Sequence, residues 1–232
     1  MVTIHDVSFL RFPETTEARN LKYLNAWIRS TVQRADAIIT VSQFVSREIC
    51  ELLRAPPQKV IPIASGLDPR LTRPAEEATA AARERLGLSR PYLLTVGTVE
   101  PRKNIRFLIE LFEQIKGFDG DLVIAGMKGW KYEPVFARIQ QSPQAARIRH
   151  LNFVSEEDLP ALYAGAELFV FPSLYEGFGF TPLEAMACGT PAVTSAAGAL
   201  PEVLGDAALI LPEFDAGLWA QSVSALLQDP TR

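Results

Sequence analysis

Short apolar runs alternate with amphipathic segments along the first part of the chain. Residues 2–4, 37–41 and 60–63 are predicted strands, because each is a short apolar run. Between the first two, apolar side chains recur at helical spacing, at Leu21, Leu24, Ile28 and Val32. Ser42 is a good N-cap for a second helix, which runs through Leu53. This alternation is typical of βαβ units with a parallel sheet.

A second α/β unit begins after a segment rich in Ala, Glu, Arg and Pro. Its predicted strands cover residues 92–96, 122–125, 148–153, 168–171, 192–194 and 208–211. A helix with one apolar face begins near Ile105 and is closed by Gly117. We therefore expect an α/β protein of two doubly wound, Rossmann-like domains. Residues 1–70 belong to the first domain, residues 71–90 form a linker, and residues 91–232 form the second domain.

The most informative segment follows the fourth predicted strand of the second unit. Gly177 and Gly179 allow backbone N–H groups to approach a ligand closely. Thr181 is expected to cap the next helix, with Pro182 at its first position and Glu184 at its third. The free N–H groups at such a helix start bind anions such as a diphosphate. The segment therefore predicts an anion site at the carboxyl edge of the sheet, where open α/β sheets bind ligands.

Two carboxylates belong to the same segment. Glu176 lies in the loop and Glu184 in the first helical turn, with seven residues between them. Both can accept hydrogen bonds from sugar or ribose hydroxyls. The alternative is a capping box, in which Glu184 only satisfies backbone donors. A nicotinamide-binding fingerprint does not fit, because Pro182 occupies the position of its third glycine.

A basic pair follows the first strand of the second unit. Arg102 and Lys103 stand after Gly97 and just before a predicted helix, which suits a diphosphate that gains charge as it leaves. A solvated basic turn is the alternative. His5 follows the first strand of the chain and is expected to face the cleft between the domains, whereas His150 is interpreted as structural.

Composition narrows the class of protein. The chain has 232 residues, 48% of them hydrophobic, and its net charge of −4 gives no signal for nucleic-acid binding. Cys50 and Cys188 are the only cysteines, so neither a disulfide framework nor a Cys-based metal site is expected. No apolar run is long enough to span a membrane and no signal peptide is recognisable, so we expect a cytoplasmic location.

Basic side chains mark the first long helix. Residues 1–70 carry 9 Lys and Arg against 7 Asp and Glu, so this part is the less acidic one. Arg19, Lys22, Arg29 and Arg34 could touch anionic lipid, which would place the protein peripherally at the inner face of the membrane. The alternative, which we favour, is a solvated helix face.

Six blocks of the sequence match the pattern of one known family: residues 3–6, 39–42, 97–104, 125–126 with 129–130, 153–155 and 176–191. Taken together, these blocks resemble the retaining GT-B glycosyltransferases of the group 1 family, and especially its mannosyltransferase B-like branch. The resemblance implies that Glu176 contacts hydroxyls of the donor sugar and Glu184 the ribose, while Lys103 binds the diphosphate. His5 would lie at the sugar on the acceptor side, and the loop after Phe153 would hold the base.

The site that the resemblance implies is therefore extensive. The expected catalytic residues are His5, Lys103 and Glu176. The expected donor-binding residues are Gly97, Arg102, Lys103, Val154, Glu176, Gly177, Phe178, Gly179, Phe180 and Glu184. Neither a metal nor a cofactor is expected, because the basic pair and the helix start can neutralise the leaving diphosphate.

The implied activity is transfer of a hexosyl group, mannose being favoured, from a nucleoside diphosphate sugar to an acceptor hydroxyl with retention of configuration. GDP-mannose is the favoured donor, and the acceptor would be a glycan or lipid-linked sugar of cell-surface polysaccharide or glycolipid synthesis. Two departures from the family pattern stand out: Thr98 replaces an Arg that many relatives carry, and residues 65–68 read Ser-Gly-Leu-Asp instead of Asn-Gly-Val-Asp. Because the family's first domain begins well before His5 and its last helix returns to that domain, we expect truncation at both ends.

Three other functions remain open at this point. Paired carboxylates could belong to a glycosidase, although such an enzyme has no use for the basic pair and the anion-binding helix start. The chain could hold a nucleotide-sugar without performing chemistry. A nucleotide-sugar epimerase of the same fold is the third alternative.

Overall fold

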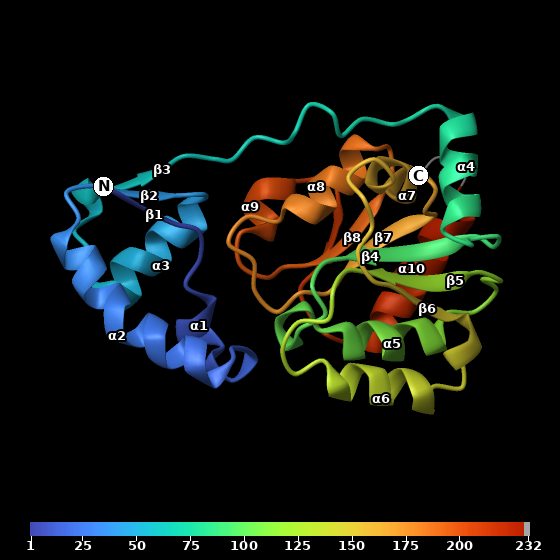
Figure 1. Ribbon diagram of the computed structural model, residues 1–232, viewed down its shortest axis with the longest axis horizontal. Helices are drawn as coiled ribbons and strands as arrows, with labels where there is room; N and C mark the ends of the chain where they lie inside the picture. The colour runs from blue at the N-terminus through green and yellow to red at the C-terminus, as the bar shows by residue number, and fades with distance from the viewer. Residues whose placement is uncertain (230–232) are drawn as a thin grey trace.

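The computed structural model describes residues 1–229, which form two parallel α/β units joined by an extended crossover. Figure 1 shows the smaller N-terminal unit beside the larger C-terminal unit, with the crossover running along the top of both. The fold class expected from the sequence, α/β with two Rossmann-like units, is confirmed.

The N-terminal unit contains a three-stranded parallel sheet in the order β1-β2-β3. Its elements are β1 (Val2–Ile4), α1 (Ser8–Arg11), η1 (Pro13–Thr15), α2 (Ala18–Arg34), β2 (Ile38–Thr40), α3 (Gln43–Leu53), η2 (Pro57–Lys59) and β3 (Val60–Pro62). The predicted cap of α3 is confirmed, because the Ser42 hydroxyl accepts a hydrogen bond from the backbone N–H of Val45 at 3.1 Å. Buried Val32 of α2 and Ile49 of α3 pack into one apolar cluster with the strands.

The C-terminal unit contains a six-stranded sheet in the order β6-β5-β4-β7-β8-β9, with every pair parallel. Its strands are β4 (Tyr92–Val96), β5 (Asp121–Ala125), β6 (Ile148–Leu151), β7 (Leu168–Phe171), β8 (Ala192–Ser195) and β9 (Leu209–Leu211). Its helices are α4 (Glu76–Arg85), η3 (Pro101–Lys103), α5 (Ile105–Gln114), α6 (Glu133–Gln141), η4 (Ala145–Arg147), α7 (Leu159–Ala164), α8 (Phe180–Ala187), α9 (Leu200–Leu204) and α10 (Ala216–Gln228).

Helices cover both faces of the larger sheet. One apolar cluster joins Leu93 and Val170 to α5, α6 and α10, and the other joins Leu94 and Phe171 to α7, α8 and α9. Successive strand residues point to opposite faces, so each buried strand must be apolar on both sides. This explains why the strands were recognisable as continuous apolar runs. The six predicted strands of this unit are confirmed, although β6 ends at Leu151, earlier than expected.

The segment expected to link the domains is structured in its second half. Residues between Pro62 and Glu76 form neither helix nor strand. α4 then packs beside α7, and Leu88 is buried in the cluster that covers the second face of the larger sheet. α4 therefore belongs to the C-terminal unit by its packing.

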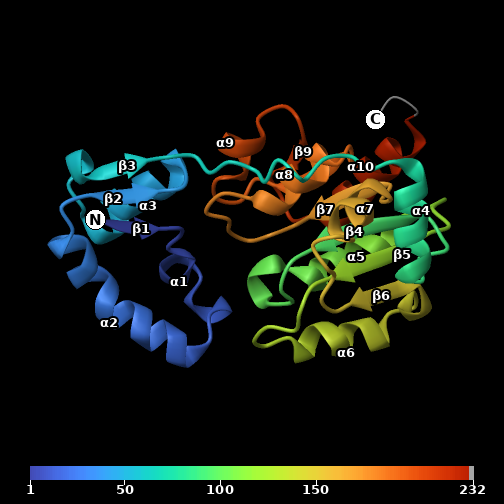
Figure 2. The same cartoon turned by 45° about the horizontal axis from the view of Figure 1, so that its top comes forward.

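The two units touch through several specific contacts. Phe178 of the C-terminal unit is buried in the apolar cluster of the N-terminal unit. The Ser42 hydroxyl donates to the carbonyl of Gly177 at 2.7 Å, and the Trp130 indole N–H donates to the carbonyl of Thr15 at 2.6 Å. Figure 2 shows α8 and α9 on the side of the larger unit that faces the smaller one. The carboxyl ends of the central strands therefore open toward this interface.

Candidate functional site

A cavity of about 260 Å³ lies where the end of β1 meets the loop between β7 and α8. Its lining comes from both units and consists of His5, Asp6, Val41, Arg102, Lys103, Glu176, Gly177, Phe178, Gly179, Phe180 and Thr181. The structure thus brings together in one cavity all three residues expected to be catalytic and most of those expected to bind the donor. Val154, Gly97 and Glu184 lie outside its lining.

Glycine permits the close approach of the two units at this cavity. A Cβ atom at Gly177 would stand 2.3 Å from the carbonyl oxygen of His5 and 2.9 Å from the Cβ of Asp6. A Cβ at Gly198 would stand 2.1 Å from the carbonyl oxygen of Glu176. Real Cβ atoms do not come this close to backbone, so both glycines are required by space. Gly177 lets the exposed His5 lie beside the loop that carries Glu176, whereas Gly198 lets the segment before α9 pack against that loop within the C-terminal unit.

Glu176 is the centre of the polar cluster in this cavity. Its Oε1 lies 2.8 Å from the Lys103 ammonium, 3.0 Å from the Arg102 guanidinium and 2.6 Å from the Ser173 hydroxyl. The Lys103 ammonium also lies 4.7 Å from the centre of the Phe171 ring. The carboxylate and both cations are thereby held in position before any donor arrives, which favours preorganised binding of an anion.

Arg102 is held more firmly than its neighbour. Its guanidinium donates to the carbonyl of Tyr175 at 2.8 Å and to the carboxylate of Glu100 at 2.7 Å. The side chains of Arg102 and Lys103 are similarly exposed, at 18% and 14%, so the difference between them lies in their hydrogen bonds. Such bonds fix the loop before Glu176, and they leave Lys103 as the freer of the two cations.

Charge and burial act against each other in this cluster. Burial raises the pKa of Glu176, but Lys103 and Arg102 outweigh it and hold that pKa below its ordinary value. At Glu100 burial prevails over Arg102 and Lys103, so the pKa of this carboxyl is raised. The two carboxyls are thus shifted in opposite directions, and the lowered pKa favours the ionised form of Glu176.

The helix start differs from the expected one. α8 begins at Phe180, one residue before the predicted cap Thr181, and Gly179 occupies the cap position with a φ of +106°. No side chain caps the helix, so the predicted Thr181–Glu184 capping box is wrong. A glycine at positive φ turns the chain into the helix earlier than a capping hydroxyl would. The first N–H groups of α8 consequently have no capping side chain among the described residues, and Pro182 lies in the first turn, where a backbone N–H has no partner within the helix.

Glu184 does not line this first cavity and faces a different one. It lines a cavity of about 860 Å³ together with Asp68, Arg70, Leu71, Ser155, Glu156, Glu157, Leu159 and Pro160. Its Oε2 accepts a hydrogen bond from the Tyr163 hydroxyl at 2.7 Å. The two carboxylates of the motif therefore face separate cavities, with the start of α8 between them. Ser155, from the loop expected to hold the base, lines the same cavity as Glu184.

Two expected site residues shape the walls instead of lining the cavities. Gly97 has a φ of +148°, and a Cβ there would stand 3.4 Å from the Lys103 side chain. Val154 is half-buried and packs against the apolar cluster over the second face of the larger sheet.

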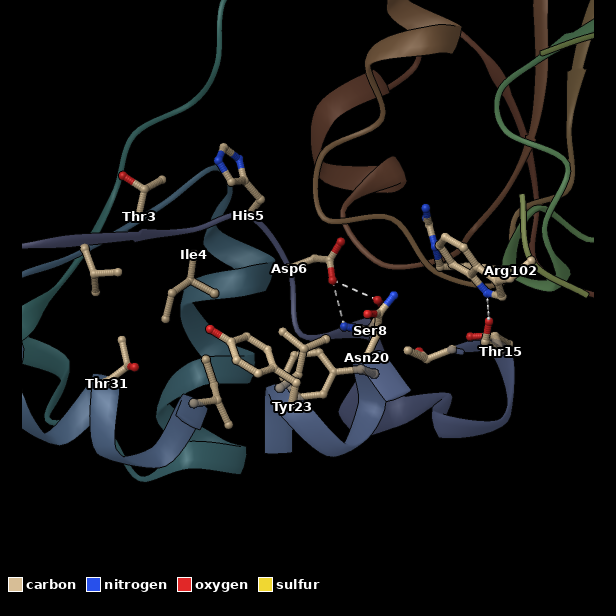
Figure 3. A pocket seen from close by; sticks show the side chains of 16 residues that line it. Thr3, Ile4, His5, Asp6, Ser8, Thr15, Asn20, Tyr23, Thr31 and Arg102 are labelled. Atoms are coloured by element: carbon tan, nitrogen blue, oxygen red, sulfur yellow. Dashed lines mark hydrogen bonds between the residues drawn. The ribbon is translucent and has the colours of Figure 1, made fainter. Parts of the chain in front are cut away.

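A third cavity, of about 530 Å³, lies between β1 and α2 and shares His5, Asp6 and Arg102 with the first. Figure 3 shows Tyr23 and Asn20 of α2 along the lower side of this cavity and Arg102 at its right, on the side of the C-terminal unit. Asp6 accepts hydrogen bonds from the backbone and hydroxyl of Ser8, at 2.9 and 2.8 Å. Sequence reasoning recognised His5-Asp6 but not this cavity, because its walls come from segments with no motif in common.

Some predicted features are structural. The His150 ring bonds the carbonyl of Gly126 at 2.9 Å and packs edge-on against Phe136, which confirms its structural role.

Within residues 1–229 no helix is long and apolar enough to cross a membrane, and no group of three or more His, Cys, Asp or Glu side chains is placed to hold a metal ion.

Family models and several known sequences similar to this chain carry the names of glycosyltransferases. A family model for glycosyl transferases group 1 matches residues 78–232, and one for glycosyltransferase family 4 matches residues 1–71. O-antigen chain mannosyltransferase B of Escherichia coli is 35% identical over 99% of this chain and 61% of its own length. Alpha-maltose-1-phosphate synthase of Mycolicibacterium smegmatis is 29% identical over 100% of this chain and 64% of its own length. The chain thus spans less than two thirds of either relative.

Solved structures agree with this result. Sucrose-phosphate synthase from Thermosynechococcus elongatus superposes with a TM-score of 0.81 at 26% identity, over 99% of this chain and 59% of that one. HepE of Anabaena, solved in complex with UDP and glucose, superposes with a TM-score of 0.84 at 21% identity, over 99% and 62%. The expected GT-B arrangement of two Rossmann-like units is confirmed. Because the group 1 model matches more than half of its residues, this chain belongs to the group 1 glycosyltransferases.

Proposed function

We propose that the protein transfers a hexosyl group, mannose being favoured, from a nucleoside diphosphate sugar to an acceptor hydroxyl with retention of configuration. The observation that carries this proposal is the cavity in which exposed His5, the Lys103–Glu176 pair and the start of α8 meet. The transferred sugar and the diphosphate are adjacent parts of one donor. If Glu176 contacts the sugar and Lys103 the diphosphate, their side chains must therefore be neighbours, and they lie 2.8 Å apart.

Each group would take one part of the donor. The uncapped N–H groups of α8 and the Lys103 ammonium would hold the diphosphate and stabilise the charge that it gains on leaving. Glu176 would accept hydrogen bonds from hydroxyls of the transferred sugar. Glu184, on the other side of the start of α8, would accept from the ribose, and the backbone beside Ser155 would meet the base.

Neutralisation of the leaving group by Lys103, Arg102 and α8 would make a divalent metal unnecessary. Arg102 contributes to this mainly by holding the loop, since its guanidinium already bonds Tyr175 and Glu100. Transfer should accordingly proceed at the same rate after treatment with EDTA. A loss of rate that Mg²⁺ or Mn²⁺ restores would contradict this part of the proposal.

For the acceptor we propose a glycan or lipid-linked sugar of cell-surface polysaccharide synthesis, with GDP-mannose as the donor. Support comes from the names of the relatives, which include O-antigen chain mannosyltransferase B. Such an acceptor would be used in the cytoplasm, with peripheral contact at the membrane. Arg19, Lys22, Arg29 and Arg34 of α2 are all exposed, which is compatible with contact to anionic lipid and also with the solvated face that the sequence favours.

Calorimetric titration with a panel of GDP- and UDP-sugars tests the donor first. Transfer is then measured with the tightest donor and mannose-bearing acceptors, and the anomeric configuration of the product is read by NMR. Donor binding without transfer or donor hydrolysis would mean a binding fragment, and isomerised donor without acceptor would mean an epimerase. Cleavage of glycosides in the absence of nucleotide would mean a hydrolase.

A further inference from the structure

The carboxylate of Glu184 has a single bonding partner among the described residues. The Tyr163 hydroxyl donates to its Oε2 at 2.7 Å, and the rest of the half-buried side chain lines the cavity of about 860 Å³. Because α8 starts at Phe180, Glu184 is too far along the helix to bond the free backbone donors of its first turn. Its orientation is therefore set by Tyr163.

Tyr163 is itself fixed on every side. Its ring is fully buried, and it packs against the Phe169 ring with centroids 5.8 Å apart. The Thr190 hydroxyl donates to its backbone carbonyl at 2.6 Å, which ties the end of α7 to the loop after α8. Burial and the neighbouring Glu184 carboxylate both raise the pKa of Tyr163, so the phenol keeps its proton. Glu184 consequently receives a hydrogen bond from a rigid donor at every working pH.

A carboxylate held by one oxygen presents the other in a defined direction. An unsupported glutamate on a half-exposed helix face samples several rotamers, and binding would have to restrict them. The bond from Tyr163 removes that cost in advance, which is the usual gain from preorganisation. The cavity that Glu184 faces also contains Ser155, from the loop that the proposed function assigns to the base.

We propose that Tyr163 is a positioning residue for nucleotide recognition, which orients Glu184 to accept hydrogen bonds from the ribose hydroxyls of the donor. This inference rests on the proposed function, in which Glu184 is the ribose ligand. It adds a residue outside the loop between β7 and α8, 21 positions before Glu184 in the chain. Tyr163 touches no ligand itself and acts only through the carboxylate.

The test compares ribose discrimination in the intact chain. GDP and UDP are titrated calorimetrically, and the tighter binder is then compared with its 2′,3′-dideoxy form. Wild type should bind the ribonucleotide more tightly. Tyr163→Phe keeps the ring in place and should reduce the ratio of the two dissociation constants about twofold to tenfold, the range for loss of one ordinary hydrogen bond. Tyr132→Phe removes a half-buried hydroxyl far from the cavity and should leave the ratio unchanged.

A double variant separates positioning from mere stability. In a Glu184→Ala background, Tyr163→Phe should cause no further change in the ratio, since the carboxylate that it orients is gone. A lower melting temperature with wild-type discrimination in Tyr163→Phe would overturn the inference and leave only a packing role. If Glu184→Ala lowers discrimination but Tyr163→Phe does not, the inference fails while the proposed function stands. If Glu184→Ala leaves discrimination intact, the ribose role and the inference fail together.

Discussion

The carboxylate of Glu202 in α9 accepts a hydrogen bond from the backbone N–H of Gln43, the first residue of α3, at 2.7 Å. Its second oxygen accepts from the N–H of Phe44 at 2.8 Å. A side chain of the C-terminal unit thus satisfies two free donors at the start of a helix in the N-terminal unit. Beside it, the Ser42 hydroxyl reaches the carbonyl of Gly177 at the edge of the first cavity. The contact therefore holds the two units together next to the site.

Removal of this contact should loosen the interface. Glu202→Ala leaves two helix-start donors to water and should cost about 1 kcal/mol, a typical value for a lost helix cap. For a chain of this size such a loss lowers the melting temperature by about 2–4 °C. Asp206→Ala, an exposed carboxylate in the next loop, is the matched control and should have no effect. Equal melting temperatures for Glu202→Ala and wild type would contradict the role given to this contact.

Contacts such as that of Glu202 with Gln43 could not have been predicted from the sequence. The two residues are 159 positions apart and belong to different units, and neither carries a motif that points to the other. The strands could be predicted, since burial on both faces forces a continuous apolar run such as that of β7. The site residues His5, Lys103 and Glu176 could be found because each follows a strand whose carboxyl end opens into the same crevice.

Local backbone geometry explains the main error. Thr181, Pro182 and Glu184 satisfy every compositional rule for a capping box, yet the helix starts at Phe180. Gly179 at φ +106° begins the helix earlier, and Glu184 is paired by Tyr163 from another helix. A glycine before an apparent cap can therefore shift a helix start, and only tertiary contacts reveal the partner of the displaced carboxylate.

The ionisation of Glu176 should be visible in the pH dependence of stability. Because the pKa of Glu176 is lowered in the folded protein, the unfolded chain binds this proton more tightly. Its contribution is therefore complete above the unfolded pKa of about 4.3 and is lost as the pH falls through the folded pKa. The stability deficit of Glu176→Gln, measured by urea unfolding, should be largest above about pH 5 and shrink toward pH 3.

Glu100→Gln provides the control of opposite sign. The pKa of Glu100 is raised in the folded protein, so ionisation of this carboxyl costs stability as the pH rises through that range. Glu100→Gln should consequently become more stable relative to wild type as the pH increases from about 4 upward. A deficit of Glu176→Gln that is equal at acid and neutral pH would exclude the ionised pair with Lys103 as its cause.

Space at the interface predicts a sharp contrast between two glycines. Gly177→Ala places a Cβ against the backbone carbonyl of His5, which cannot rotate away as a flexible side chain would, so the segment after β1 and the loop that carries Gly177 must move apart. Overpacking of this kind costs about 1–3 kcal/mol, and donor affinity should fall with it because the same movement widens the cavity. Gly66→Ala meets nothing within 4 Å and should leave stability unchanged or raise it by about 0.4–1 kcal/mol. Urea unfolding and donor calorimetry on both variants check this contrast. If Gly177→Ala has the same stability and donor affinity as Gly66→Ala, the close approach at Gly177 does not shape the cavity.

Lys103→Ala should separate binding from chemistry. The ammonium is held by Glu176 at 2.8 Å with 14% of its side chain exposed, so it is fixed before the donor arrives and is placed to neutralise charge that develops only as the diphosphate leaves. An interaction realised mainly in the transition state lowers kcat more than it raises KM. Loss of one such group lowers kcat about 10²- to 10³-fold, whereas KM for the donor should change by far less.

Lys116→Ala, an exposed lysine just after α5, is the control and should retain wild-type kinetics. An equal fall in donor affinity and unchanged kcat would instead make Lys103 a simple binding residue, and the stabilisation of the leaving group would then have to come from the start of α8.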